Sequence, residues 1–219
     1  MPRDKKPGLA AFGDCVAVST PLCSARNDVS AVLLAGGESR RMGTDKATFL
    51  FRGKPLWQVQ LETLRRLRPT EIFVSARTDP SWRPADVRFI PDILPSCGPL
   101  SGLAASLAKI HTAYLVVLAI DMPFMTRNYL RSMFDAIEPG RGVVAKIDNR
   151  AEPLAALYPR EAEIDFRVAL AGTDFSLQNL VRHLVTSGKL LEISVMDQER
   201  PLFRNVNNVS DLDPMAARG

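Results

Sequence analysis

Short apolar runs alternate along this chain with longer stretches of mixed polarity. Residues 30–35 form a continuous apolar run with β-branched content, and residues 112–120 form the clearest run of this kind. Such runs are typical of parallel strands that are covered on both faces. We therefore expect strands over residues 30–35, 71–76, 87–90 and 113–120, and helices over residues 55–67, 101–111 and 126–137, with ends good to about 2–4 residues.

The pattern changes beyond residue 140. Residues 142–147 and 152–158 are expected to pair as a small additional β layer, helices are expected near residues 160–170 and 175–186, and a strand near residues 190–195. The alternation of strands and helices predicts an α/β fold with a doubly wound, mostly parallel sheet. In such sheets, ligands bind outside the carboxyl ends of the strands.

Length and composition are those of one globular domain. A chain of 219 residues with 46% hydrophobic content is long enough for one sizeable α/β domain, and we assign that domain to residues 29–219. Residues 1–28 mix Pro, Gly, Ser, Lys and Asp with isolated apolar residues and follow no sustained period. This pattern predicts a flexible N-terminal extension.

Composition also argues against several classes of protein. No apolar run approaches the length of a membrane span, and polar residues interrupt the apolar stretch at residues 9–18, which argues against a secretory signal. The three cysteines stand at unrelated spacings, which favours a reducing cytoplasm over a disulfide framework or a zinc cluster. A net charge of +4 suits an anionic substrate, but no basic stripe indicates nucleic acid binding. We expect a cytoplasmic protein with no membrane and no nucleic acid partner.

A glycine-rich bend directly follows the first expected strand. Gly36 and Gly37 are able to take positive φ and lack a Cβ, so successive backbone N–H groups can approach a phosphate closely. Arg40, Arg41 and Lys46 add positive charge within the same stretch. The alternative interpretation is an ordinary strand-to-helix turn with solvated basic residues.

This stretch matches neither the P-loop nor the dinucleotide-binding pattern. Residues 34–46, which read LAGGESRRMGTDK, resemble the L-A-G-G-x-S-x-R-M-G-x-D-K signature of the MobA-like nucleotidyltransferases, and in particular that of the molybdenum cofactor guanylyltransferases. Further segments resemble those of the family in the same order: Gly98-Pro99-Leu100-Ser101-Gly102, Asp121-Met122-Pro123-Phe124, residues 152–158 and Asn205-Val206-Asn207-Asn208. Together they cover residues 30–213, and the resemblance implies a Rossmann-like nucleotidyltransferase fold.

The resemblance also implies a set of site residues. It gives catalytic roles to Lys46, Arg41 and Asp121, and it makes Asp121 a ligand of Mg²⁺. The implied nucleotide-binding residues are Leu34, Ala35, Gly36, Gly37, Lys46, Ser75, Asp92, Gly98, Pro99, Leu100 and Asp121. Pro153, Asn205 and Asn207 resemble the residues of the acceptor side, although the asparagines also suit a turn before a helix at Ser210.

The local sequence supports Asp121 and Lys46 independently. Asp121 follows a mostly apolar run, so its carboxylate would emerge at the sheet edge, where it can bind Mg²⁺ together with phosphates and waters. It could instead cap the next helix, but Thr126 is the better candidate for that position. Lys46 is a point charge on a long side chain, suited to charge developing on a leaving pyrophosphate. Asp45 is expected to orient Lys46 or the loop, because a carboxylate repels phosphate.

The remaining nucleotide-site residues rest mainly on the resemblance. Asp92 can accept hydrogen bonds from a guanine edge or a ribose hydroxyl, or can simply form a turn after Pro91. Ser75 lies where guanylyltransferases of this family often have an asparagine. Gly98 and Gly102 would let main chain pack close to the base.

These features lead to a functional prediction. The chain has two histidines and lacks an evident pair of a nucleophile and a base. Transfer onto a phosphate monoester needs no protein base, because the second pKa of the phosphate is about 6 and the group is largely dianionic at pH 7. We predict a GTP:molybdenum cofactor guanylyltransferase with GTP and molybdopterin as substrates. Transient contact with molybdenum-insertion proteins or apo-molybdoenzymes is also expected. The alternatives are a cytidylyltransferase of the same superfamily, of the molybdopterin-cytosine or methylerythritol type, and a non-catalytic nucleotide- or cofactor-binding protein.

Overall fold

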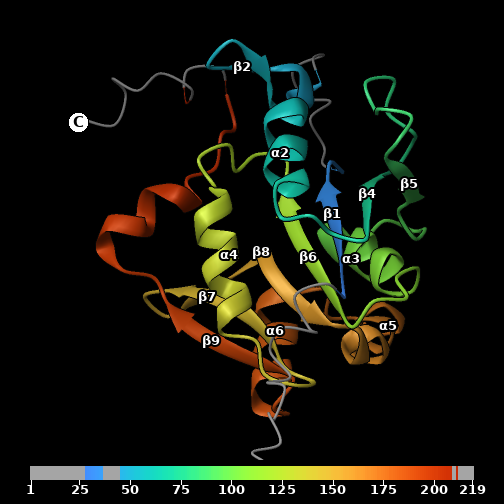
Figure 1. The fold of residues 1–219 in the computed structure, drawn as a ribbon. Helices are drawn as coiled ribbons and strands as arrows, with labels where there is room; N and C mark the ends of the chain where they lie inside the picture. The colour runs from blue at the N-terminus through green and yellow to red at the C-terminus, as the bar shows by residue number, and fades with distance from the viewer. Residues whose placement is uncertain (1–27, 37–44, 209–210, 212–219) are drawn as a thin grey trace, which may run out of the picture.

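A mostly parallel sheet lies at the centre of the protein (Figure 1). The structure, a computed structural model, describes residues 28–36, 45–208 and 211. In these residues seven strands form one sheet in the order β5-β4-β1-β6-β8-β7-β9. The strands are β1 Val29–Leu34, β4 Glu71–Ala76, β5 Arg88–Pro91, β6 Tyr114–Ala119, β7 Gly142–Ile147, β8 Arg150–Pro159 and β9 Leu190–Ser194. β8 alone among them runs antiparallel to its neighbours.

Helices cover both faces of this sheet (Figure 1). Leu33 of β1 belongs to a core shared with α2 (Leu56–Arg65) and α4 (Arg127–Asp135), whereas Val32 belongs to a core shared with α3 (Pro99–Leu107), α5 (Glu163–Ala171) and α6 (Leu177–Thr186). Successive strand residues point to opposite faces, so a strand between two cores must be apolar throughout. The continuous apolar runs of the sequence therefore predict the central strands correctly.

The expected α/β fold with a doubly wound, mostly parallel sheet is confirmed. The separate β layer is a correction: residues 142–147 and 152–158 do pair, but β8 also pairs with β6, so both strands extend the main sheet. The reason is that Ala155 to Tyr158 of β8 are buried, and their backbone groups need partners on both sides. The expected helix at residues 101–111 begins earlier, with Pro99 at its first position, and ends at Leu107.

Several shorter elements complete the described chain. They are the 3₁₀ helices η2 (Lys46–Thr48), η3 (Arg160–Ala162) and η4 (Asp197–Phe203) and a hairpin of β2 (Leu50–Phe51) and β3 (Lys54–Pro55). Its turn residues Arg52 and Gly53 both have positive φ, as a two-residue hairpin loop with a type I′ turn requires. No described helix is long and apolar enough to cross a membrane.

The carboxyl ends of three central strands meet at one edge of the sheet. Leu34 pairs in register with Ser75 on one side and with Ala119 on the other. Ala35 N donates to Ser75 O over 2.9 Å, and Ile120 N donates to Leu34 O over 3.0 Å. The segments that follow β1, β4 and β6 therefore lie side by side. The predicted extension, residues 1–28, lies outside the described residues except for Asp28, whose carbonyl accepts from Tyr114 N.

Candidate active site

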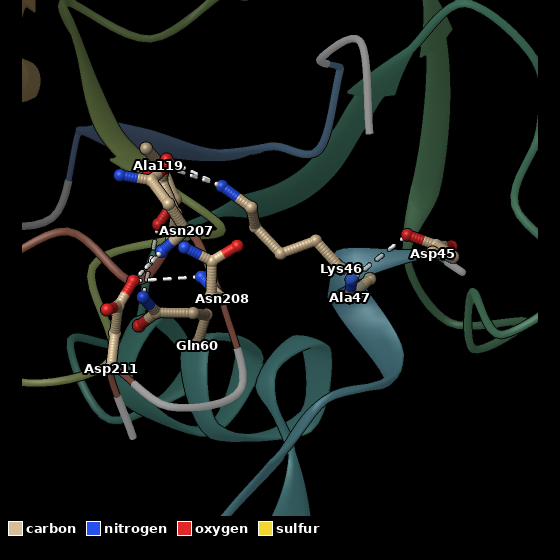
Figure 2. A network of polar contacts seen from close by, with 9 residues as sticks. Asp45, Lys46, Ala47, Gln60, Ala119, Asn207, Asn208 and Asp211 are labelled. Atoms are coloured by element: carbon tan, nitrogen blue, oxygen red, sulfur yellow. Dashed lines mark hydrogen bonds and ion pairs between the residues drawn. The ribbon is translucent and has the colours of Figure 1, made fainter. Parts of the chain in front are cut away.

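Lys46 and Asp121 meet at this edge of the sheet. Lys46 Nζ lies 3.4 Å from Asp121 Oδ2. The same atom lies 3.1 Å from Asn207 Oδ1 (Figure 2). The side chains of Lys46 and Asp121 are 17% and 26% exposed, so the pair is reachable from solvent. Three segments that are distant in the sequence thus contribute one ammonium, one carboxylate and one carboxamide to the same small volume.

The backbone around Asp121 leaves its carboxylate at the surface. β6 ends at Ala119, and the Asp121 carbonyl accepts a hydrogen bond from Val206 N over 2.8 Å. The helix that follows is capped by Thr126, whose hydroxyl oxygen accepts from Tyr129 N. The expectation that Thr126 rather than Asp121 caps this helix is therefore confirmed, and the Asp121 side chain is not used for capping.

The closing Asn-Val-Asn segment alternates between solvent and core. Val206 is fully buried, whereas Asn205 and Asn207 on either side of it are exposed. Asp211 Oδ2 accepts from the backbone N–H groups of Asn207 and Asn208 at 2.7 and 2.8 Å (Figure 2). These two bonds lower the pKa of Asp211, and the bond from Asn208 has the larger effect. The segment combines turn chemistry with a contact to Lys46; Ser210 lies outside the described residues.

Ser75, Asp92, Gly36 and Gly102 form a second cluster at the same edge. Ser75 Oγ donates to Asp92 Oδ1 over 2.9 Å. Burial raises the pKa of Asp92, and the bond from Ser75 acts in the opposite direction. A Cβ on Gly36 would lie 2.8 Å from Asp92 Oδ2, and one on Gly102 would lie 2.8 Å from Ser75 Oγ. Real Cβ atoms essentially never approach so closely, so a larger residue at either position would displace the Asp92 carboxylate or the Ser75 hydroxyl. Gly36 does not have a positive φ, so that part of the expectation is wrong, and the missing Cβ here makes space for Asp92.

The Gly98 segment starts helix α3. Gly98 has φ of +68°, a conformation that favours glycine, and Pro99 is the first helical residue. Ser101 Oγ accepts from Cys97 N over 2.8 Å, while Leu100 is buried in the core. Leu100 can therefore offer a ligand only its backbone, and the same holds for the buried Leu34.

The other expected site residues are placed as follows. Ala35 is half-buried, with its N–H bonded to Ser75 O. Pro153 is buried in β8, and its carbonyl accepts from the Tyr158 hydroxyl over 2.9 Å. Gly37 and Arg41 lie outside the described residues. Asp45 is the N-cap of η2, where its Oδ1 accepts from Ala47 N over 2.9 Å, in line with the orienting role expected for it.

Gln60 is a residue of this region that the sequence interpretation missed. It is fully buried, and its Nε2 donates to Ala119 O over 3.1 Å, directly before the segment that carries Asp121 (Figure 2). Its Oε1 is buried without a partner in the described structure. A signal was present, because Gln60 stands on the apolar face of its helix with Leu56 and Leu64.

One carboxylate at this edge could contribute to a metal site. Among the described residues no group of three or more His, Cys, Asp or Glu side chains is placed to hold an ion. A single carboxylate is nevertheless what an octahedral hard cation needs when phosphates and waters fill the other positions. Asp121 is such a carboxylate, with the Asn207 carboxamide oxygen near the same ammonium.

The protein is an α/β protein with a charged pair at the carboxyl edge of its sheet, where folds of this kind bind their ligands. Residues 31–187 match the model of the MobA-like NTP transferase domain, and the chain belongs to this family of nucleotidyltransferases.

Proteins with related sequences and structures agree with this family. A protein of Opitutus terrae named "Probable molybdenum cofactor guanylyltransferase" is 32% identical, over 84% of this chain and 93% of its own. The molybdenum cofactor guanylyltransferase of Histophilus somni is 30% identical, over 84% and 94% of the two chains. The crystal structure of molybdopterin-guanine dinucleotide biosynthesis protein A from Archaeoglobus fulgidus superimposes with a TM-score of 0.68 at 26% identity, over 84% and 94%.

Proposed function

We propose that this protein transfers GMP from GTP to the terminal phosphate of Mo-molybdopterin. A phosphate oxygen of the acceptor attacks the α-phosphorus of GTP, the new P–O bond forms in line with the bond that breaks, and pyrophosphate leaves. The product is molybdopterin guanine dinucleotide. The observation that carries the proposal is the meeting of Lys46 and Asp121 at the carboxyl edge of the sheet in a chain with guanylyltransferase relatives.

Lys46 is proposed to bind the β- and γ-phosphates and to offset the charge that builds on pyrophosphate. Its ammonium already lies at the strand edge with partners that it can exchange, since both contacts are partly exposed. Arg41 is assigned the same task from the sequence alone. Asp121 would hold Mg²⁺, and the ion would neutralise phosphate charge when bound.

The Asp92 cluster is proposed to take the nucleoside. The Asp92 carboxylate can accept hydrogen bonds from a guanine edge or a ribose hydroxyl, and the lack of a side chain at Gly36 and Gly102 lets it lie close to both. Backbone groups of Leu34, Ala35, Gly98, Pro99 and Leu100, with Gly37 beyond the described residues, complete the proposed nucleotide site.

The acceptor is proposed to lie against Asn205 and Asn207. Asn207 is exposed beside Lys46, so its carboxamide can face an entering phosphate. Pro153 would contribute the shape of β8 rather than a polar contact. The acceptor phosphate is largely dianionic at neutral pH, so no protein group needs to remove a proton from it. We further propose that the reaction takes place in the cytoplasm and that the product passes to a partner protein.

The experiment that tests the reaction type uses GTP labelled at one phosphorus. With molybdopterin and Mg²⁺ present, label at the α-phosphorus should appear in a molybdopterin dinucleotide, and label at the γ-phosphorus in pyrophosphate. Label from the γ-position in the pterin product would mean phosphoryl transfer and would contradict the proposal. Binding of GTP with release of neither product would favour the non-catalytic alternative.

A further inference from the structure

The loop between β4 and β5 reaches the residue that precedes Lys46. Trp82 of this loop donates from Nε1 to Asp45 Oδ2 over 2.8 Å. The other oxygen of the same carboxylate, Oδ1, accepts from Ala47 N over 2.9 Å and so caps η2. One carboxylate therefore joins the tryptophan to the short helix on which Lys46 stands.

Trp82 is itself held in place on two sides. Its ring stacks on Trp57 of α2, with centroids 5.7 Å apart and planes 13° from parallel. Within its own loop, Arg83 binds Asp79 through two bonds of 2.7 Å and donates to the Val87 carbonyl. A bidentate arginine–carboxylate pair fixes direction as well as distance. The indole N–H of Trp82 thus reaches Asp45 from a loop that is held in place by these contacts.

The cap controls the backbone at Lys46. Thr48 N and Oγ1 both donate to Asp45 O, and Phe49 N donates to Lys46 O. η2 contains only one turn, so it is not stabilised by its own length and depends on its cap. When Asp45 holds its rotamer, the start of the Lys46 side chain is fixed and Nζ reaches Asp121.

We propose that Trp82 is a positioning residue for transfer: through Asp45 it fixes the η2 backbone, and so holds Lys46 where the leaving pyrophosphate develops charge. Trp82 acts on the reaction only through Asp45 and Lys46. The inference rests on the proposed function, because it assigns Trp82 to the Lys46 step. It predicts an effect on kcat rather than on GTP binding, since misplacing a group that acts in the transition state lowers turnover.

The test uses Trp82→Phe, which keeps a smaller aromatic ring against Trp57 and removes the N–H donor. We expect kcat for GMP transfer to fall about fivefold to tenfold while KM for GTP changes less than about twofold. Trp57→Phe is the matched control, because it changes the other ring and leaves the bond to Asp45; it should change kcat less than about twofold. Equal losses in the two variants would mean that only the ring stack matters and would overturn the proposal.

The Lys46→Ala background separates positioning from general damage. If Trp82 acts through Lys46, Trp82→Phe should lower the residual kcat of Lys46→Ala no further, because the coupled residues fail as a unit. The same fivefold to tenfold loss in both backgrounds, about the value expected for one hydrogen bond, would contradict the inference.

A second readout needs no turnover. The chain has two tryptophans, so a ¹⁵N spectrum of the full chain should show two indole N–H signals, and Trp82→Phe identifies the one from Trp82. Asp45→Ala should shift that signal to higher field, because the side-chain acceptor is lost. An unchanged signal would show that the bond is absent and would refute the inference even in an active enzyme. A wild-type protein that transfers no GMP would instead contradict the proposed function. The spectrum would still show whether the bond between Trp82 and Asp45 is present.

Discussion

Lys46 and Asp121 stand 75 positions apart in the sequence, and their charged groups lie 3.4 Å apart at the edge of the sheet. The pair is partly exposed, and pairs of this kind contribute only about 0–1 kcal/mol to stability. Its placement therefore matters more for function than for folding. Lys46 can leave Asp121 to bind phosphate, and Asp121 can leave Lys46 to bind a metal, at little cost in free energy. Substitution of either residue should therefore test function without unfolding the protein.

Asp121→Ala should lose most GMP transfer and keep its fold. If the carboxylate holds the metal, its removal should lower kcat by about 10²-fold or more, while the melting temperature changes by only a few degrees. Steady-state rates and thermal melts measure the two effects. Asp86→Ala, which removes an exposed carboxylate elsewhere, is the control. Parental rates in a folded Asp121→Ala protein would remove the residue from the mechanism.

Lys46→Ala should separate turnover from binding. The ammonium acts most strongly as charge develops on pyrophosphate, so we expect kcat to fall by about 10²-fold with a smaller loss of GTP affinity. Kinetics and calorimetry with GTP give the two numbers. Lys109→Ala, beyond the end of α3, should leave both unchanged. A loss confined to affinity would show that Lys46 binds substrate and transition state equally.

Gly36→Val should weaken GTP binding severely. A Cβ at this position would lie 2.8 Å from Asp92 Oδ2, so a β-branched side chain would displace the carboxylate proposed to bind the nucleoside. Calorimetry should show about a 10²-fold or greater loss of affinity. Gly172→Ala is the matched control, because a Cβ there meets its nearest atom at 3.5 Å. Normal GTP binding by a folded Gly36→Val protein would reduce the opening motif to a turn.

Asp92→Asn should gain stability and lose affinity. Burial raises the pKa of Asp92, so the folded protein binds more protons than the unfolded chain at pH values between the ordinary aspartate pKa and the raised one. Stability due to this group is therefore full below that window and declines as pH rises through it. The asparagine variant avoids the decline and should melt at a higher temperature at pH 7, with a difference that vanishes near pH 3.

Affinity for GTP should change in the opposite direction, falling about tenfold in Asp92→Asn because a charged acceptor is lost. Ser75→Ala provides a comparison, since it removes a bond that lowers the pKa of Asp92. If the difference in melting temperature between Asp92→Asn and the parent did not change with pH, the Asp92 carboxylate would be well solvated, which would contradict the prediction.

Much of the fold follows from local sequence because strand β1 and strand β6 are apolar on both faces, a pattern with few other solutions. Thr126 as the helix cap is likewise a local property. The joining of β8 to β6 could not be predicted, because a pairing between residues 118 and 155 depends on the whole sheet rather than on either strand.

The site shows the same division. The motif residues predict that Lys46 and Asp121 lie at the same edge of the sheet, but the contact of Lys46 with Asn207 depends on the path of the closing segment. The close contact between Gly36 and Asp92 could not be predicted either, because nothing in the sequence around Gly36 indicates that Asp92 lies beside it. The bond between Trp82 and Asp45 crosses 37 positions without any spacing pattern.

Donor choice is the most direct test of the account. Each of the four nucleoside triphosphates is supplied with molybdopterin and Mg²⁺, and pyrophosphate release gives kcat/KM for each donor. The Gly36-Gly37 and Gly98-Pro99-Leu100 segments and the guanylyltransferase relatives lead us to expect GTP to exceed CTP, ATP and UTP, with release that requires the acceptor. A clear preference for CTP would contradict the account and assign the protein to the cytidylyltransferases.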